Sequence, residues 1–193
     1  MAGRLGPLKI PWRGDESAED PYWEFFINQP PSDPRNAVTE IIRRAPDGAV
    51  FPTKADIHTP EVTASHIKEL ARWLGADLVG IVSLPSDGAA NGDAYPFAIV
   101  CAVRAEHDPR VAPGIGGQVP VQNGLFVTFV LSAYIRELGY RATASLDPEA
   151  EKLAATAGLG SLNADGRLVT AQHGTRVHVA DVIRTDLPLA ADA

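Results

Sequence analysis

Two apolar runs, at residues 76–84 and 97–104, constrain the fold more than any other feature of this chain. The second run shows almost no alternation of apolar and polar residues, which is the pattern of a strand buried on both faces. A helical pattern precedes the first run. Thr59 suits its N-cap, Pro60 its first position and Gly75 its end. We therefore expect buried strands that pack against at least one helix.

The second half of the chain predicts further helices and strands. Residues 122–138 form the strongest helical pattern, and residues 105–118 before it are expected to be a loop. Leu125, Phe126, Phe129 and Val130 make the first half of this helix apolar nearly all round, so we expect that half to be deeply buried. The other expected elements are a short strand at 140–146, a helix capped by Asp147 that ends at Gly158, and a strand at 175–184. The fold class expected is α+β, with helices on a mainly antiparallel or mixed sheet.

Residues 1–58 differ from the rest of the chain because they are rich in proline, which disfavours long regular elements. A short helix is nevertheless expected at 36–44. The same stretch carries an unusual number of aromatic residues for a solvated tail. They are Trp12, Tyr22, Trp23, Phe25 and Phe26. We expect an extended N-terminal arm that lays these rings on the same domain or on a second copy, followed by a regular domain at 59–193.

Charge and composition exclude several classes of function. The net charge of −7 gives no electrostatic basis for binding nucleic acid or an anionic membrane. The single cysteine, Cys101, lies in an apolar run and is expected in the core, and it cannot build a cysteine-ligated cluster. No signal peptide begins the chain, and residues 125–135 are too short for a membrane span. The protein is expected to be cytoplasmic.

The segment 157–170 carries the strongest functional signal. Gly158, Gly160 and Gly166 follow the end of the third helix, and glycine lets a bulky partner approach the backbone closely. Such a loop can offer N–H groups to the amides or phosphate of a large ligand. On these residues alone, a purely structural turn between helix and strand is an equal alternative.

Blocks of sequence in the same order resemble the cobalamin-binding domain of reductive dehalogenases and epoxyqueuosine reductases. The blocks are LGADLVGI at residues 74–81, AYIRELGY at 133–140, AGLG at 157–160, GRLVT at 166–170, HGTR at 173–176 and RTDLPL at 184–189. The resemblance covers roughly residues 59–189. It implies a fold like that of flavin nitroreductases, with a sheet flanked by helices, in which the glycine loop lines a cobalamin pocket.

The resemblance also implies a set of cofactor-binding residues. By position in the matching blocks these are Gly158, Leu159, Gly160, Ser161, Leu162, Asn163, Gly166, His173, Thr175 and Arg176. No metal site is expected, because the histidines lack a metal-ligand spacing.

The sequence differs from the family enzymes in two features, the segment that delivers electrons to the cofactor and the residue that donates a proton. Family enzymes continue after the TDLPL motif into a segment with clustered cysteines, whereas this sequence ends at Ala193, so we expect no iron–sulfur cluster and a separate electron-donor protein. Residues 121–126 lack the tyrosine acid of the dehalogenases, and Tyr134 is assigned to core packing. Asp147 and Arg176 are the remaining candidates for catalytic groups.

These observations leave several functions open. The first is a cobalamin-binding protein that acts in redox chemistry with a separate donor. The others are a cobalamin carrier or processing protein without turnover, a degenerate ligand-free structural subunit, and a flavin-binding oxidoreductase. A homodimer is expected, because nitroreductase-like domains commonly pair and an aromatic arm can wrap a neighbour.

Overall fold

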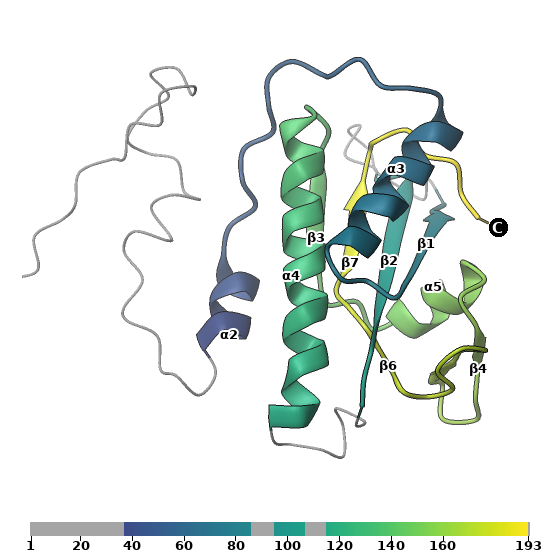
Figure 1. The fold of residues 1–193 in the computed structure, drawn as a ribbon. Coiled ribbons are helices and arrows are strands. Elements are labelled where there is room, and N and C mark those ends of the chain that lie inside the picture. The colour runs from purple at the N-terminus through teal and green to yellow at the C-terminus, as the bar shows by residue number, and fades with distance from the viewer. Residues whose placement is uncertain (1–36, 86–94, 107–114, 193) are drawn as a thin grey trace, which may run out of the picture. The chain divides into compact units, whose positions relative to one another are not determined.

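The computed structural model describes residues 37–85, 95–106 and 115–192 (Figure 1). The chain divides into two compact units, Met1–Ala49 and Val50–Ala193. The described element of the first unit is α2 (Ala37–Arg44), which agrees with the helix expected at 36–44. The five aromatic residues assigned to an N-terminal arm lie outside the described residues.

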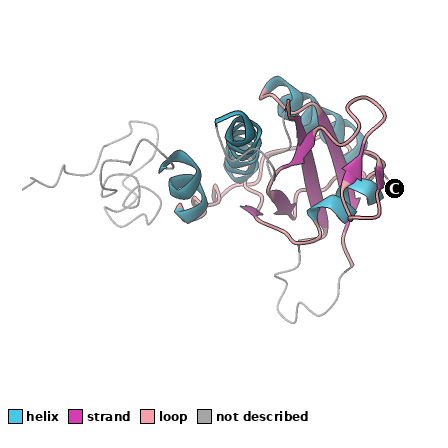
Figure 2. Cartoon of the chain, turned by 90° about the horizontal axis from the view of Figure 1, so that it is seen from below, coloured by secondary structure: helices cyan, strands magenta, loops and turns pink. Residues whose placement is uncertain are grey.

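The second unit is built on one antiparallel sheet. Its strands are β1 (Leu78–Ser83), β2 (Phe97–Arg104), β3 (Ala142–Ser145), β6 (Val177–Val179) and β7 (Val182–Thr185). Their order is β1-β2-β7-β3, with β6 paired to the far end of β2, and every pairing is antiparallel. The helices of this unit flank the strands (Figure 2). The expected α+β class is confirmed.

The strand expected at 175–184 is interrupted, and the single-strand prediction was wrong. Residues Ala180 and Asp181 separate β6 from β7, so that β2 pairs with both in succession. Gly124 of the helix above approaches this point so closely that a Cβ on it would lie 2.9 Å from the Cβ of Ala180. The break in the strand therefore coincides with a close approach of helix and sheet.

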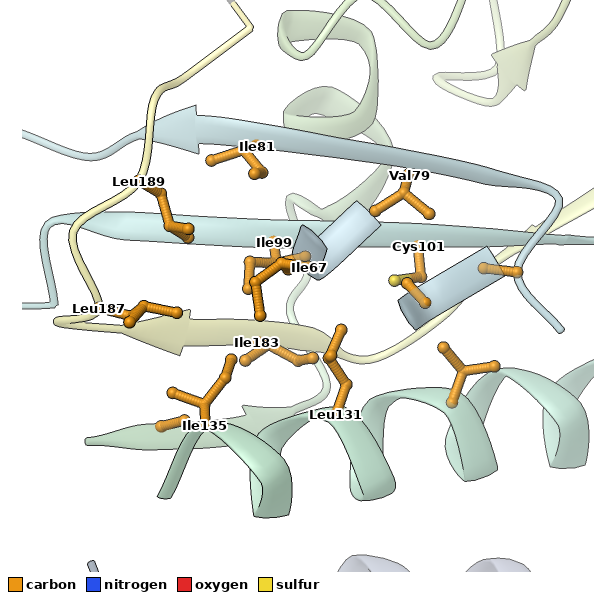
Figure 3. Close-up of a cluster of buried hydrophobic side chains, with 14 of the residues drawn as sticks. Ile67, Val79, Ile81, Ile99, Cys101, Leu131, Ile135, Ile183, Leu187 and Leu189 are labelled. Carbon is orange, nitrogen blue, oxygen red and sulfur yellow. The ribbon is translucent and has the colours of Figure 1, made fainter. Parts of the chain in front are cut away.

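Two helices, α3 (Pro60–Trp73) and α4 (Ile115–Glu137), cover one face of the sheet. Figure 3 shows Ile67 of α3 and Leu131 and Ile135 of α4 lying against side chains of the strands. The fully buried partners on the strands include Ile81, Ile99 and Ile183. Full burial of one such side chain stabilises the fold by roughly 1.5–3 kcal/mol, so this layer is the main core.

The start of α3 confirms the capping prediction. The Thr59 hydroxyl oxygen accepts a hydrogen bond from the backbone N–H of Val62 at 3.5 Å, and Pro60 takes the first helical position. Gly75 follows the helix with φ of +115°, a conformation that residues with a Cβ rarely adopt.

Helix α4 is longer and less deeply buried than the sequence predicted. It begins at Ile115 rather than near 122, so the loop expected at 105–118 was wrong for its last residues. Pro120 lies in the second turn, where it removes a single backbone donor. Phe126 is 52% exposed and Tyr134 43% exposed, so assigning these two rings to the core was wrong. No helix in the described part of the chain combines the length and apolarity needed to cross a membrane.

The other face of the sheet packs against α5 (Ala150–Thr156) and a small hairpin of β4 (Ser161–Leu162) and β5 (Leu168–Val169). Val100 of β2 points to this face, opposite to its neighbours in the strand, and packs with Ala154 of α5. A Cβ on Gly80 would lie 2.5 Å from the Cβ of Ala157. The glycine in β1 therefore lets the end of α5 lie directly on the sheet.

Candidate functional site

The glycine-containing segment after α5 folds into a tight hairpin. Gly158, with φ of +75°, turns the chain at the end of α5, and β4 then pairs with β5 through the Leu162–Leu168 register. Asn163 stabilises the turn, because its Oδ1 accepts hydrogen bonds from the backbone N–H of Asp165 at 3.0 Å and of Arg167 at 2.9 Å. This is the Asx geometry expected of asparagine in a turn.

One side of the hairpin is fixed to α5 and to the core. Leu168 is buried with Val100 and Ala154, and its backbone N–H donates to Oε2 of Glu151 at 2.8 Å. Glu151 thus joins the first turn of α5 to the second strand of the hairpin. The sequence analysis missed this role, because an acidic residue early in a helix is common for unrelated reasons.

The turn between β5 and β6 lies beside the hairpin. Thr170 and Gly174 exchange two backbone hydrogen bonds of 2.9 Å, and the Thr170 hydroxyl accepts from the N–H of His173 at 3.1 Å. A guanidinium nitrogen of Arg167 reaches the carbonyl oxygen of Thr175 at 3.4 Å. Hairpin and turn are therefore tied together, and the structure brings all ten predicted cofactor-binding residues into one small region.

These ten residues divide into a structural group and an exposed group. The structural group includes Leu159, which packs against the buried cluster of Val100, Ala154 and Leu168, and Asn163, which holds the turn. It also includes Gly160, because a Cβ on this residue would lie 2.3 Å from the carbonyl oxygen of Val169. His173 is half-buried. The residues with exposed surface are Gly158, Ser161, Leu162, Gly166, Thr175 and Arg176. A ligand bound to this region would contact the exposed group, while the structural group determines the shape of the hairpin and turn.

Asp147 lies at the opposite end of α5 from the hairpin. It is not the N-cap residue that the sequence predicted, because α5 begins after Glu149. Its Oδ1 accepts from the N–H of Glu149 at 2.8 Å, which fixes the turn leading into the helix. Its Oδ2 accepts from a guanidinium nitrogen of Arg184 on β7 at 2.6 Å. The predicted catalytic candidates lie on different elements, because Asp147 precedes α5 whereas Arg176 lies in the turn before β6.

The surroundings of Asp147 favour its ionised form. Burial acts to raise the pKa of this carboxyl, but the Arg184 hydrogen bond and charge and the Glu149 amide together hold the pKa below its ordinary value. A carboxyl that is ionised at neutral pH has no proton to donate there. The geometry therefore suits a structural ion pair better than a general acid.

Other chemistry-bearing groups are sparse in the described residues. Burial raises the pKa of the Cys101 thiol to about 12, so the sulfur stays protonated and is neither a nucleophile nor a metal ligand at neutral pH. Within residues 37–85, 95–106 and 115–192, no three His, Cys, Asp or Glu residues gather in a way that could hold a metal ion.

Comparisons with solved structures find reductive dehalogenases among the similar chains. The catabolic reductive dehalogenase NpRdhA is 29% identical, with a TM-score of 0.64 over 80% of this chain and 24% of that chain. A second reductive dehalogenase, for which a mechanism of B12-dependent dehalogenation is suggested, is 24% identical, with a TM-score of 0.64 over 98% of this chain and 28% of that chain. The resemblance to reductive dehalogenases is confirmed.

The matching region is a limited part of those proteins. This chain spans about a quarter of the length of the dehalogenase structures it matches. An epoxyqueuosine reductase bound to a tRNA stem loop also aligns, at 13% identity and a TM-score of 0.47, which is too low to support a conclusion. No protein-family model and no curated protein matches the sequence.

The exposed surface of the hairpin and turn fits a group such as cobalamin. A Cβ placed on Gly158, Gly166 or Gly174 would meet no atom within 4 Å, so a large ligand can reach the backbone there. Leu162 is 41% exposed and offers apolar surface, while Arg176 offers a cation to a phosphate. The hairpin and turn thus expose glycine backbone, one apolar side chain and one cation to a ligand.

Proposed function

We propose that residues 50–193 form a cobalamin-binding domain of the reductive dehalogenase type, acting in redox chemistry. The observation that carries the proposal is the 29% identity to a reductive dehalogenase over 80% of the chain. The B12 dependence of the second, more distant dehalogenase indicates which cofactor to expect. The open glycines of the hairpin and turn support a binding surface at the residues that the sequence resemblance selects.

In this proposal the residues of the hairpin and turn bind and orient the cofactor. Leu162 contacts the apolar part of the ring system, Arg176 pairs with the phosphate, and the backbone at Gly166 allows close approach. When bound, cobalamin supplies a cobalt ion that accepts electrons and delivers them to a substrate. Asn163 and Glu151 act indirectly, because they hold the hairpin in place through the turn and through α5.

The electrons are proposed to come from a donor outside these residues. The 193 residues contain one cysteine, and iron–sulfur clusters are held by several cysteine thiolates. The buried, protonated Cys101 could not contribute even one such ligand without unfolding the core. We therefore propose a separate electron-donor protein.

The proposal is tested by cofactor retention. Purified protein is mixed with hydroxocobalamin and passed through a desalting column, and the visible spectrum of the protein peak is recorded. A retained corrin spectrum at about one cofactor per chain is the expected result. A colourless peak, both with and without reductant, would remove the cobalamin proposal and leave a ligand-free structural subunit, with flavin as the next ligand to test.

A cobalamin carrier or processing protein without turnover is the second candidate. It is favoured by two observations: Arg184 helps to hold Asp147 in its ionised form, and residues 121–126 offer no tyrosine in its place. The cobalamin-loaded protein is supplied with a chemical reductant and a halogenated aromatic compound. Halide release that depends on protein and reductant supports the redox role, whereas stable binding without halide release supports the carrier.

A further inference from the structure

Two histidines lie next to each other at the start of α3, far in sequence from the hairpin. His58 immediately precedes the cap residue Thr59, and His66 lies in the body of the helix. Their ring centroids are 5.5 Å apart, and the ring planes are at 84°. Both side chains are exposed. The Thr63 hydroxyl donates to the carbonyl oxygen of His58 at 3.3 Å, which ties the backbone of the first histidine to the helix that carries the second.

This separation matches two imidazoles that share one metal ion. An ion bonded to a ring nitrogen at about 2.1 Å lies about 3.2 Å from the ring centroid, so a tetrahedral angle places two centroids about 5.2 Å apart. The observed 5.5 Å is close to that value. Because both side chains are exposed, modest rotations can direct one nitrogen of each ring to a common point.

We propose that His58 and His66 form a binding site for a divalent transition-metal ion of the class that imidazole prefers, namely Zn²⁺, Ni²⁺ or Cu²⁺. Among the described residues, no third His, Cys, Asp or Glu completes a group of metal ligands with this pair. Water therefore takes the remaining positions, as it does at sites that keep open coordination. The bound ion would join the segment before α3 to the helix itself, and so stabilise the folded form.

The site is tested by titrating the full chain with ZnCl₂ in a calorimeter near pH 7.5. The variants are His58→Ala, His66→Ala and the double substitution, and Ser65→Ala serves as the matched control on the neighbouring exposed position of α3. Circular dichroism and the unfolding midpoint without metal establish that each variant is folded. The experiment needs no cobalamin, so it stands apart from the proposed function.

The expected result is one Zn²⁺ per chain for the unmodified protein and for Ser65→Ala, with a rise in the unfolding midpoint on adding Zn²⁺. Each single histidine variant should bind at least about tenfold more weakly and lose the rise, because half of the ligand set is gone. The double variant should lose the remaining binding, and its loss should be smaller than the sum of the two single losses, since both histidines act on one site. Unchanged Zn²⁺ affinity in either single variant, or no binding at all, would overturn the proposal and leave a simple edge contact between two rings.

Discussion

At the scale of single residues, Gly160 determines whether the hairpin can close. A Cβ on this residue would lie 2.3 Å from the carbonyl oxygen of Val169, a backbone atom that cannot rotate away. We expect Gly160→Ala to lower the free energy of unfolding by about 1–3 kcal/mol, as overpacking does elsewhere. Urea denaturation measures this loss. Ser161→Ala, next to it and exposed, should stay within about 0.5 kcal/mol. Equal stability of Gly160→Ala and the unmodified protein would contradict the observed packing.

The close packing at Gly160 makes this residue a poor probe of the proposed cobalamin site. If a Gly160 variant lost cobalamin binding, the result would not distinguish between a ligand blocked by the new side chain and a distorted hairpin. Leu162 and Arg176 are better positions, because their side chains are exposed and hold no part of the turn together. Substitutions there change the surface that a ligand meets while the hairpin keeps its hydrogen bonds.

The Asp147–Arg184 pair predicts a pH-dependent contribution to stability. The Asp147 side chain is 8% exposed and that of Arg184 is 42% exposed, so solvent weakens the pair in part. We expect Asp147→Asn to cost about 1–2 kcal/mol at pH 7. The pKa of Asp147 is lowered in the folded state, so this contribution is complete above the unfolded pKa of about 4 and disappears as pH falls through the folded value.

Denaturation of the protein and of Asp147→Asn at pH 7 and at pH 3 measures the effect. The gap in unfolding free energy should be present at pH 7 and smaller at pH 3. Asp165→Asn, at an exposed turn position, is the matched control and should show little change at either pH. A gap that grows on acidification would mean that the pKa of Asp147 is raised, not lowered.

Some of these structural roles could be predicted from the type of residue alone, and others could not. The glycines of the hairpin and the cap at Thr59 were predictable, because each residue type has a local backbone role that needs no knowledge of the fold. Tyr134 and Asp147 were misassigned, because their environment depends on which side of a helix faces the core and on a partner in a distant strand.

At the scale of elements, the contact between α4 and the sheet depends on Gly124. This residue faces the break between β6 and β7, where a Cβ would lie 2.9 Å from that of Ala180 and 3.4 Å from Cδ2 of His178. We expect Gly124→Leu to destabilise the protein by about 1–3 kcal/mol, because the larger side chain must push α4 away from the strands. Asn123→Leu, one residue earlier and exposed, should change stability little. Thermal unfolding of both variants tests this, and equal midpoints would show that α4 does not pack as described.

The boundaries of elements followed from sequence only where one signal dominated. The run at 97–104 predicted β2 to the residue, because continuous apolar character reflects burial on both faces. The sequence predicted neither the start of α4 nor the break after Val179. Proline in an early turn is tolerated when the rest of the helix is anchored, and a strand break beside a closely packed helix leaves no local pattern.

At the scale of the whole molecule, the segment before α3 belongs physically to the second unit. The N–H of Phe51 donates to the carbonyl oxygen of Arg136 at 2.9 Å, and the N–H of Ala55 to that of Leu138 at 2.8 Å. A Cβ on Gly139 would lie 2.6 Å from the carbonyl oxygen of Thr53, so the segment rests directly on the end of α4.

This arrangement predicts where the chain can be shortened. A protein that begins at Val50 should unfold in one cooperative transition, whereas one that begins at Thr59 should be less stable by about 1–3 kcal/mol through the lost hydrogen bonds and contacts. Urea denaturation of the two shortened proteins makes the comparison. Equal stability would place the boundary of the regular domain near 59, where the sequence alone had put it.

The resemblance to dehalogenases was visible in the sequence because its blocks occur in a fixed order, and the fold agrees with it. The position of a cofactor could be predicted only as a set of residues. Their division into a structural group and an exposed group required the hairpin, since register and burial decide which side chains face outward.

The proposed function requires that the hairpin and the following turn bind cobalamin. Hydrogen–deuterium exchange, measured with and without hydroxocobalamin, tests binding and its location together. We predict slower exchange across residues 158–176 when cobalamin is present, and a smaller effect in Leu162→Glu, whose charge opposes contact with the apolar part of the ring system. No change in exchange across residues 158–176, or protection confined to other parts of the chain, would contradict cobalamin binding at the hairpin and turn.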